Sequence, residues 1–502
     1  MGKRRDDSLT VSQRVDIAIT VLAPDRPHGT ITELAREHEV SRPTIYTIAA
    51  AGKQAMLAGL EPGPHGPHPE ETLIRVDRNR LVRGSVVLSE VGVSQRDVQV
   101  CLGELLDTPM SPSWVNAELA KIEQTAANVN QACQPSVVET KSGDELYSNG
   151  QPNLLVVGND SLYIYALTRQ PTCDGETWGC VLLEVPACEQ LSSDGGSGLA
   201  AGVKLAQIPF HQLDWDHLLR PQWGQAERLD QRAYAAWQAT EERAAKFLAA
   251  STPKRLARHW AAWERLSAEA EDKVTRADAF RCLAQQVDQE FGLIDLETGQ
   301  LRDPQTAGDR LRQVGQQLQH WTGPIYEKLS SYLINGATAL FSYQPLLARA
   351  LTSLTQQWGT PAIQALARLW QIEADEKRHP PSLLERQARQ AVWEASLDQA
   401  AGLLGEQLWA AWLALSNTLG RAWRGSSLAE CVNGLLRPIL DGRQHTDQGC
   451  LELFRFLHNS RPFARGKRAK YSPAELAGLE TPEDPLILLG LAPKCKSNSP
   501  GF

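Results

Sequence analysis

Residues Asn153–Leu167, NLLVVGNDSLYIYAL, contain two short apolar runs separated by a turn. The runs 153–158 and 162–167 are rich in Leu, Val, Ile and Tyr, and the Asn-Asp-Ser between them has the residue types of a tight turn. This pattern predicts two strands joined by a turn. The stretch therefore marks a β-sheet core in a chain whose other segments read mostly as helix.

Further strand patterns lie on both sides of this pair. We expect strands near 137–147, 189–193 and 206–213, with one helix near 176–183 and another after the Gly-rich loop at 194–198. The order is three strands, then helix, strand, helix and strand, which is the order of a ribonuclease H-like core. We therefore predict an α/β fold with a mixed sheet, whose first part spans 135–221 and whose last part spans 426–480.

A long helical segment separates the two parts of this predicted core. Residues 222–425 are rich in Ala, Leu, Gln, Arg and Glu, with breaks at 300–304 and 378–381 and no fixed repeat. We interpret 222–425 as an all-helical insertion domain. The Pro, Lys, Ser, Asn and Gly content after about 480 predicts a flexible tail over 481–502.

The first 60 residues read as three short helices and resemble a helix-turn-helix in the stretch 34–46, LAREHEVSRPTIY. Ser41 is a suitable N-cap for the last helix, and Val40 and Ile45 are expected to point inward. An ordinary three-helix bundle is the alternative, but we favour DNA binding. The side chains expected to face the major groove are Arg42, Thr44, Tyr46 and Thr47.

A Pro/Gly/His linker at 61–69 ends this module, and residues 70–134 form a second helical module. Weaker helix-turn-helix signals lie at 93–98 and 111–115. The net charge of −8 does not suggest a nucleic-acid binder, but the cations are locally concentrated. Residues 461–470 contain five Lys or Arg and no acid, and Lys3, Arg4 and Arg5 open the chain. Such patches suit phosphate binding, while a solubility function is the alternative.

The stretch 426–443, SSLAECVNGLLRPILDGR, places Glu430, Asn433 and Arg437 on one predicted helix. Two isolated aspartates, Asp144 and Asp194, lie upstream in the predicted strand region. Phosphoryl transfer on DNA uses two divalent cations about 3.5–4 Å apart, and Mg²⁺ prefers carboxylate ligands. We therefore predict that Asp144, Asp194 and Glu430 form a cage for two Mg²⁺ ions, for which Mn²⁺ could substitute.

Other acids close to these positions were weighed as ligands. Glu145 follows Asp144, but strand alternation points it to the other face of the sheet. Asp214 and Asp216 could replace Asp194 as the second acid, although a Gly-flanked aspartate at a strand end fits metal access better. His217 is interpreted as a structural or substrate-facing residue, because imidazole is not a favoured ligand of Mg²⁺.

The segment from about 140 to 480 resembles a DDE transposase of bacterial insertion sequences. No single motif is specific for this family, but the order of the motifs along the chain is. The matching pieces are 143–147 (GDELY), 152–157 (PNLLVV), 160–161 (DS), 176–178 (ETW), 193–196 (SDGG), 212–214 (QLD) with His217, 430–433 (ECVN), 436–438 (LRP), 458–459 (HN), 462–463 (PF), 466–468 (GKR) and 472–473 (SP).

The resemblance implies a ribonuclease H-like core with catalytic and metal-binding Asp144, Asp194 and Glu430, and Mg²⁺ as cofactor. It also implies transposition, with double-stranded terminal inverted repeats and target DNA as partners and a homo-oligomer assembled on them. A helical insertion before the last carboxylate accounts for the long separation of Asp194 from Glu430. Besides the helix-turn-helix side chains, the expected DNA-binding residues are Asn433, Arg437, Asn459, Arg465, Lys467 and Arg468.

Two other functional classes remain as alternatives to an active transposase. One is a domesticated transposase that binds DNA without cutting it, and the other is a different ribonuclease H-like nuclease, such as a resolvase. The nine cysteines are scattered without a CxxC pair, and no apolar run long enough for a signal peptide or a membrane span is present. We therefore expect a cytoplasmic, nucleoid-associated protein without a zinc site.

Overall fold

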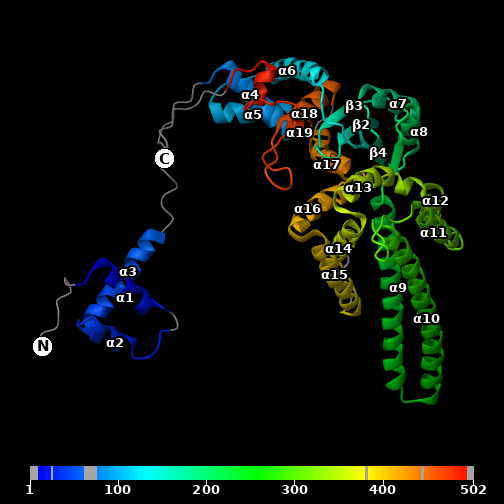
Figure 1. The fold of residues 1–502 in the computed structure, drawn as a ribbon, viewed down its shortest axis with the longest axis horizontal. Helices are drawn as coiled ribbons and strands as arrows, with labels where there is room; N and C mark the ends of the chain where they lie inside the picture. Colours follow the sequence, from blue (N-terminus) through cyan, green and yellow to red (C-terminus); the bar gives the residue numbers. More distant parts are fainter. Residues whose placement is uncertain (1–8, 24–25, 61–75, 379–382, 443–445, 494–502) are drawn as a thin grey trace. The chain divides into compact units, whose positions relative to one another are not determined.

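The computed structural model describes residues 9–23, 26–60, 76–378, 383–442 and 446–493 (Figure 1). The predicted linker at 61–69, the cations at 3–5 and the end of the tail at 494–502 lie outside the described residues. Contacts divide the chain into two units, Met1–Arg75 and Val76–Phe502.

The first unit consists of three helices: α1 (Val11–Leu22), α2 (Thr30–Glu37) and α3 (Arg42–Leu60). Ile17, Val40 and Ile45 are buried in its core. The Ser41 hydroxyl accepts a hydrogen bond from the Thr44 amide at 3.2 Å, which satisfies one free donor at the start of α3. Helices α2 and α3 are joined by a short turn in which Val40 is the buried residue.

The second unit contains a five-stranded sheet in the order β3-β2-β1-β4-β5. Strand β2 runs antiparallel to β1 and β3, whereas β1, β4 and β5 are mutually parallel, so the sheet is mixed. Helices α7 and α8 supply the crossovers between its later strands. The bounds are β1 (Lys141–Ser148), β2 (Gln151–Gly158), β3 (Ile164–Arg169), α7 (Gly175–Glu184), β4 (Gln190–Ser193), α8 (Ser197–Leu205) and β5 (Phe210–Leu213).

Two strands are shorter than the sequence pattern predicts. Residues 137–140 are extended but lie outside β1, and the Val137 amide donates to the Ala477 carbonyl instead of to a strand. Residues 206–209 do not join β5, because Gln207 adopts a left-handed φ of 54° and turns the chain after α8. Apolar composition marks the strands correctly here, but it does not mark where a hydrogen-bonding neighbour is present.

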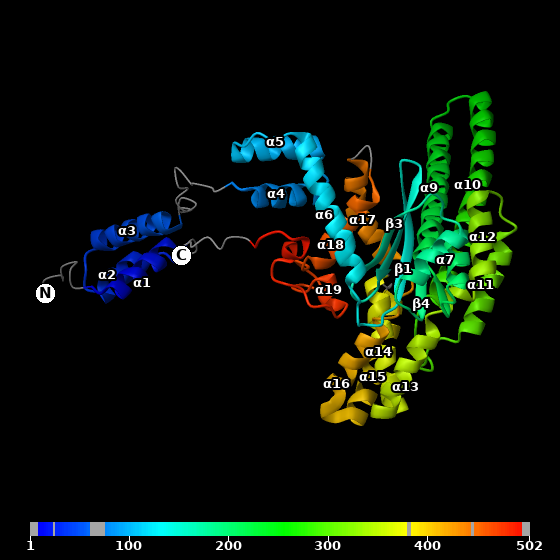
Figure 2. The same cartoon turned by 90° about the horizontal axis from the view of Figure 1, so that it is seen from above.

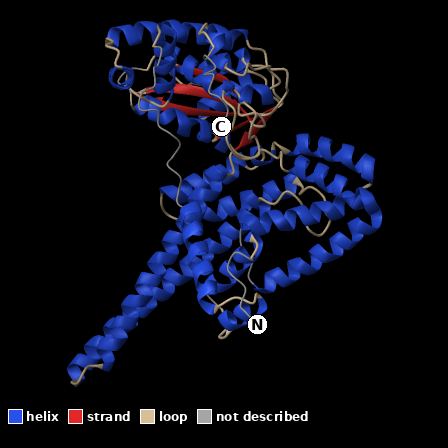
Figure 3. Cartoon of the chain, turned by 90° about the vertical axis from the view of Figure 1, so that its left-hand side faces the viewer, coloured by secondary structure: helices blue, strands red, loops and turns tan. Residues whose placement is uncertain are grey.

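Helices cover both faces of the sheet, which explains why every residue of β2 after Gln151 is buried (Figures 2 and 3). Leu155 and Val157 pack toward α17 (Ser427–Asp441) and α18 (Gln448–Ser460). Leu154 and Val156 point the opposite way and pack with side chains of α7 and α8. The unit therefore contains an α/β core of three layers.

A helical group, α4 (Arg78–Glu90), α5 (Gln95–Leu106) and α6 (Pro112–Ala132), packs against α18. The short helix η4 (Pro485–Leu489) joins this group by burying Leu486 and Leu489. Asp484 pairs with Arg83 at 2.6 Å, which ties the same segment to α4. The prediction of a flexible tail is therefore wrong for 481–493, because a short apolar run there supplies a contact that the overall composition hides.

Between β5 and α17, the described residues (214–378 and 383–426) are helical apart from short turns and one isolated bridge, Ile294 to Leu301. Its helices enclose a core that includes Trp215, Phe280 and Phe341. They are α9 (Asp216–Leu248), α10 (Pro253–Glu290), α11 (Pro304–Leu318), α12 (Pro324–Gly336), α13 (Gln344–Trp358), α14 (Thr360–Arg378), α15 (Leu383–Leu404) and α16 (Leu408–Leu419). None of the helices in the described ranges has the length and apolar character needed to cross a membrane.

The packing of the sheet against α7 and α8 predicts a large cost for removing its central indole. Trp178 is fully buried in this layer, so Trp178→Ala should lower the free energy of unfolding by about 3–5 kcal/mol. Trp409→Ala removes an indole that is 72% exposed, and it should change the free energy of unfolding by less than about 0.5 kcal/mol. Equal effects in urea denaturation would contradict this packing.

Candidate metal-binding site

Asp144 lies within β1, where it pairs with Leu155 and so faces α17. Its Oδ2 accepts a hydrogen bond from the Asn433 side-chain amide at 2.8 Å, and its Oδ1 accepts one from the Glu145 amide at 2.9 Å. Burial, aided by the negative charges of Asp194 and Glu430, raises the pKa of Asp144 to about 6. A bound cation would relieve this repulsion.

Asp194 is the first residue after β4, and its position follows from the parallel pairing of β4 with β1. Ser192 lies opposite Ser142, so continuing the register by two residues places Asp194 beside Asp144. The Asp194 carboxylate accepts a hydrogen bond from the Gly196 amide at 2.9 Å. Gly195 has a φ of 86°, a conformation that glycine adopts without strain, and this turn directs the chain from β4 into α8.

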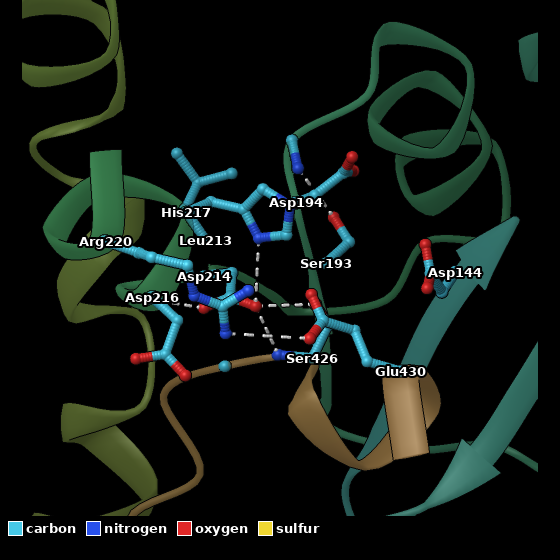
Figure 4. A network of polar contacts seen from close by, with 12 residues as sticks. Asp144, Ser193, Asp194, Leu213, Asp214, Asp216, His217, Arg220, Ser426 and Glu430 are labelled. Atoms are coloured by element: carbon cyan, nitrogen blue, oxygen red, sulfur yellow. Dashed lines mark hydrogen bonds and ion pairs between the residues drawn. The ribbon is translucent and has the colours of Figure 1, made fainter. Parts of the chain in front are cut away.

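Glu430 lies in the first turn of α17 and is half-buried. The Arg220 guanidinium is 3.9 Å from its carboxylate. Figure 4 shows Asp144, Asp194 and Glu430 on three different elements around one region of the second unit. The sequence prediction named these three carboxylates. The strand register places Asp194 beside Asp144, and the hydrogen bond from Asn433 to Asp144 brings the turn of α17 that carries Glu430 to the same strand.

Asp214, directly after β5, is fully buried and accepts several hydrogen bonds. Its Oδ2 accepts from the Ser426 amide at 2.8 Å and from the Ser426 hydroxyl at 2.6 Å, and its Oδ1 accepts from the Asp216 amide at 2.7 Å. Burial raises the pKa of Asp214, but the interactions with His217 and Ser426 outweigh it, so the pKa lies below its usual value. Asp214 thus holds the start of α17.

His217 completes a second group of possible ligands around Glu430. Its Nδ1 is 3.3 Å from Asp214 Oδ2, and the interaction with Asp214 raises the pKa of His217. Ligand atoms of Asp214, His217 and Glu430 all lie within 4.8 Å of one another, so this group could hold a metal ion. Asp216, the other alternative acid, is exposed and is not part of the group.

Glu145 lies opposite Leu154 and therefore faces the α7 and α8 side of the sheet, as strand alternation predicts. Burial, followed by the charges of Asp194 and Asp144, raises the pKa of Glu145 to about 7. The Glu145 carboxyl lies close to the turn at Asp194, since a Cβ at Gly196 would meet both Asp194 Oδ1 and Glu145 Oε1. Sequence reasoning missed this proximity, because it considered only the face of the sheet and not the turn at Asp194.

The predicted DNA-binding residues of α17 and α18 have different surroundings. Arg437 is exposed, whereas Asn433 is buried and donates to Asp144. Asn459 is also buried, and both polar atoms of its side chain bond to the backbone of Ile164. The DNA-contact prediction is therefore wrong for Asn433 and Asn459. The side-chain amides of both residues form hydrogen bonds inside the core. In the sequence, the three-residue spacing of Glu430 and Asn433 indicates that both side chains lie on the same face of the helix, close to one site.

The basic loop after α18 and the face of α3 also differ residue by residue. Arg465 and Lys467 are exposed, but the Arg468 guanidinium donates to the backbone carbonyls of Asp160 and Asn159 at 2.7 and 2.8 Å. Arg468 therefore supports the turn between β2 and β3. In the first unit, the side chains of Arg42, Tyr46 and Thr47 are exposed and that of Thr44 is half-buried.

No protein-family model matches the chain, and a comparison with curated proteins finds no match. Function is therefore inferred from the geometry and chemistry of this site.

The hydrogen bonds of Asp214 predict a large structural effect of its removal. Asp214→Ala should lower the free energy of unfolding by roughly 2–4 kcal/mol, because it leaves the buried Ser426 donors without an acceptor. Asp216→Ala, two residues away and exposed, should cost less than about 0.5 kcal/mol. Urea denaturation of both variants measures the difference, and equal stabilities would show that Asp214 does not anchor α17.

Proposed function

We propose that the chain is a DDE-type transposase, which cleaves and joins DNA strands with a ribonuclease H-like core. The observation that carries this proposal is the placement of three carboxylates at one end of the mixed sheet. Asp144 comes from the middle strand β1, Asp194 from the end of the adjacent parallel strand β4, and Glu430 from a helix packed across β1. The sheet order and the antiparallel β2 also support a core of this type.

The donor set suits hard divalent cations. Asp144, Asp194 and Glu430 would hold Mg²⁺ or Mn²⁺, because carboxylate oxygens are the preferred protein ligands of these ions. Such ions supply activation of the attacking hydroxyl and stabilisation of the charge that develops on the phosphoryl group. Asp214 and His217 surround Glu430, but Asp214 already accepts hydrogen bonds from Ser426 and Asp216. We therefore assign these two residues to positioning.

The remaining residues of the site orient the acids. Asn433 and Glu430 lie one turn apart on α17, so the same helix that carries the third acid also donates a hydrogen bond to the first. Asp214 fixes the beginning of this helix through Ser426. The three acids would thus be held in a rigid arrangement before DNA binds, which is a requirement for catalysis by positioning and electrostatics.

The partner in this proposal is double-stranded DNA, both transposon ends and target, bound by a homo-oligomer. The exposed Arg42, Tyr46 and Thr47 of α3 would contact bases and phosphates, and Arg465 and Lys467 would contact phosphates. A nucleoid location follows from these contacts. A silent DNA-binding protein is disfavoured because all three acids are present, while a different ribonuclease H-like nuclease would show the same acids but no preference for inverted repeats.

Cleavage assays with charge-removing variants test the catalytic assignment. Asp144→Asn, Asp194→Asn and Glu430→Gln should each lower the cleavage of a duplex carrying the inverted repeats that flank the gene by several orders of magnitude. Binding to this duplex should persist. The wild type should cut with Mg²⁺ or Mn²⁺ and stop when EDTA is added, and Asp216→Asn is the control that should cut normally.

Two results would decide against the assignment. A wild-type protein that binds the repeats but does not cut them with any divalent cation would favour the silent binder. Full cleavage by Asp194→Asn, together with loss in Asp214→Asn that has normal stability, would transfer the second metal-ligand role to Asp214.

The basic loop allows a separate test of phosphate binding. Replacing both Arg465 and Lys467 with Ala should weaken binding to all duplexes and reduce the salt dependence of the affinity by about two in log–log slope. Arg468→Ala should instead act mainly on stability, because its guanidinium bonds to the turn at 159–160. Fluorescence anisotropy at several salt concentrations measures the slopes, and an unchanged slope in the double variant would make the loop a solubility feature.

A further inference from the structure

The outer end of the α9–α10 hairpin has an unusual charge distribution for this acidic chain. Its residues 243–263, RAAKFLAASTPKRLARHWAAW, contain five Lys or Arg and one His but no Asp or Glu. The chain as a whole has 59 acidic and 51 basic side chains. An acid-free segment with five cations at the end of a helical pair is therefore a local positive surface, here called the hairpin tip.

Most cations of the hairpin tip lack a charged partner. Lys246, Lys254, Arg255 and Arg258 are exposed, and none of them forms an ion pair with any residue that the structure describes. Cations closer to the base of the same hairpin behave differently, since Arg281 pairs with Asp230 and Lys273 pairs with Glu269. The charge of the tip is consequently free to attract an external anion.

The hairpin tip also exposes apolar and aromatic side chains. No residue of the hairpin tip is buried, so no third element covers it. Phe247, Trp260 and Trp263 form a row of rings with centroids 5.5 and 5.1 Å apart, and Trp260 remains 46% exposed. Leu248 at the end of α9 is 81% exposed. Clustered cations on an uncovered surface are typical of nucleic-acid-binding proteins.

The two helices give this surface a long reach. Helix α9 has 33 residues, and a rise of about 1.5 Å per residue gives it a length of roughly 50 Å. Figure 1 shows α9 and α10 projecting together beyond the other helices of the second unit, and Figure 3 shows the same projection from another side. Because α9 begins at Asp216, two residues after Asp214, the hairpin starts beside the candidate metal-binding site and ends far from it.

We propose that the hairpin tip binds the phosphate backbone of duplex DNA at a distance from the catalytic acids. The inference rests on the proposed function, because a duplex long enough to reach the tip must also be held at the site. Charge complementarity favours DNA over a second copy of this chain: a symmetric contact between two tips would bring ten like-charged Lys and Arg side chains of residues 243–263 together. The contact neutralises phosphates without reading bases.

The test compares two double variants of the full-length chain. Lys254→Ala with Arg258→Ala removes two tip cations, and Arg228→Ala with Arg232→Ala removes two exposed cations nearer the base of α9. The probe is a duplex of about 50 base pairs that carries the flanking inverted repeat. If each tip cation neutralises one phosphate, the tip variant should reduce the slope of log affinity against log salt by about two, and the control should leave it unchanged.

The outcomes separate this inference from the proposed function. An unchanged slope in the tip variant, while the wild type binds and cuts the duplex, would overturn the inference and leave the transposase proposal standing. A wild type that neither binds nor cuts would overturn both. An unchanged slope accompanied by a change of oligomeric state in sedimentation would overturn the DNA contact and assign the tip to contacts between copies of the chain.

Discussion

The buried carboxylate of Asp214 is the constraint on which the site depends. It accepts hydrogen bonds from the amide and hydroxyl of Ser426, and thereby joins the end of β5 to the start of α17. The chain leaves the sheet for the long helical segment at Asp214, and it returns to the sheet at Ser426. The Trp215 amide adds a bond to the Arg424 carbonyl at 3.0 Å. Without these hydrogen bonds, the start of α17, which carries Glu430, would no longer be joined to the end of β5.

The same junction anchors the inserted helices to the sheet. The Tyr332 hydroxyl donates to the Asp214 carbonyl at 2.8 Å, and Gln212 bonds to the backbone of Leu340 and Tyr343. The Arg424 guanidinium lies over the Phe291 ring at 3.7 Å, where the cation and the aromatic face attract each other. A movement of the inserted helices would therefore displace the start of α17, the helix that carries Glu430.

Sequence reasoning succeeded where local pattern decides structure. The order of strands and helices around Asn153–Leu167 follows from composition and turns, and it correctly predicts that Asp144 and Asp194 lie in the sheet region. It could not find pairings between distant residues: the clasp of Asp214 with Ser426, the amide of Asn433 on Asp144 and the bonds of Asn459 to Ile164 join positions hundreds of residues apart. Nothing in a single sequence records such contacts, so buried polar residues were interpreted as DNA ligands.

The central claim is that Asp144, Asp194 and Glu430, rather than Asp214 and His217, hold the catalytic ions. A crystal of the wild-type protein bound to its DNA end can be grown in a buffer that contains Mn²⁺ and no Ca²⁺. The anomalous scattering of Mn²⁺ then locates the ions. We predict two Mn²⁺ ions about 3.5–4 Å apart, with the Asp144 carboxylate between them and Asp214 still bonded to Ser426. A single ion bound by Asp214, His217 and Glu430, with Asp144 and Asp194 free of metal, would contradict the account.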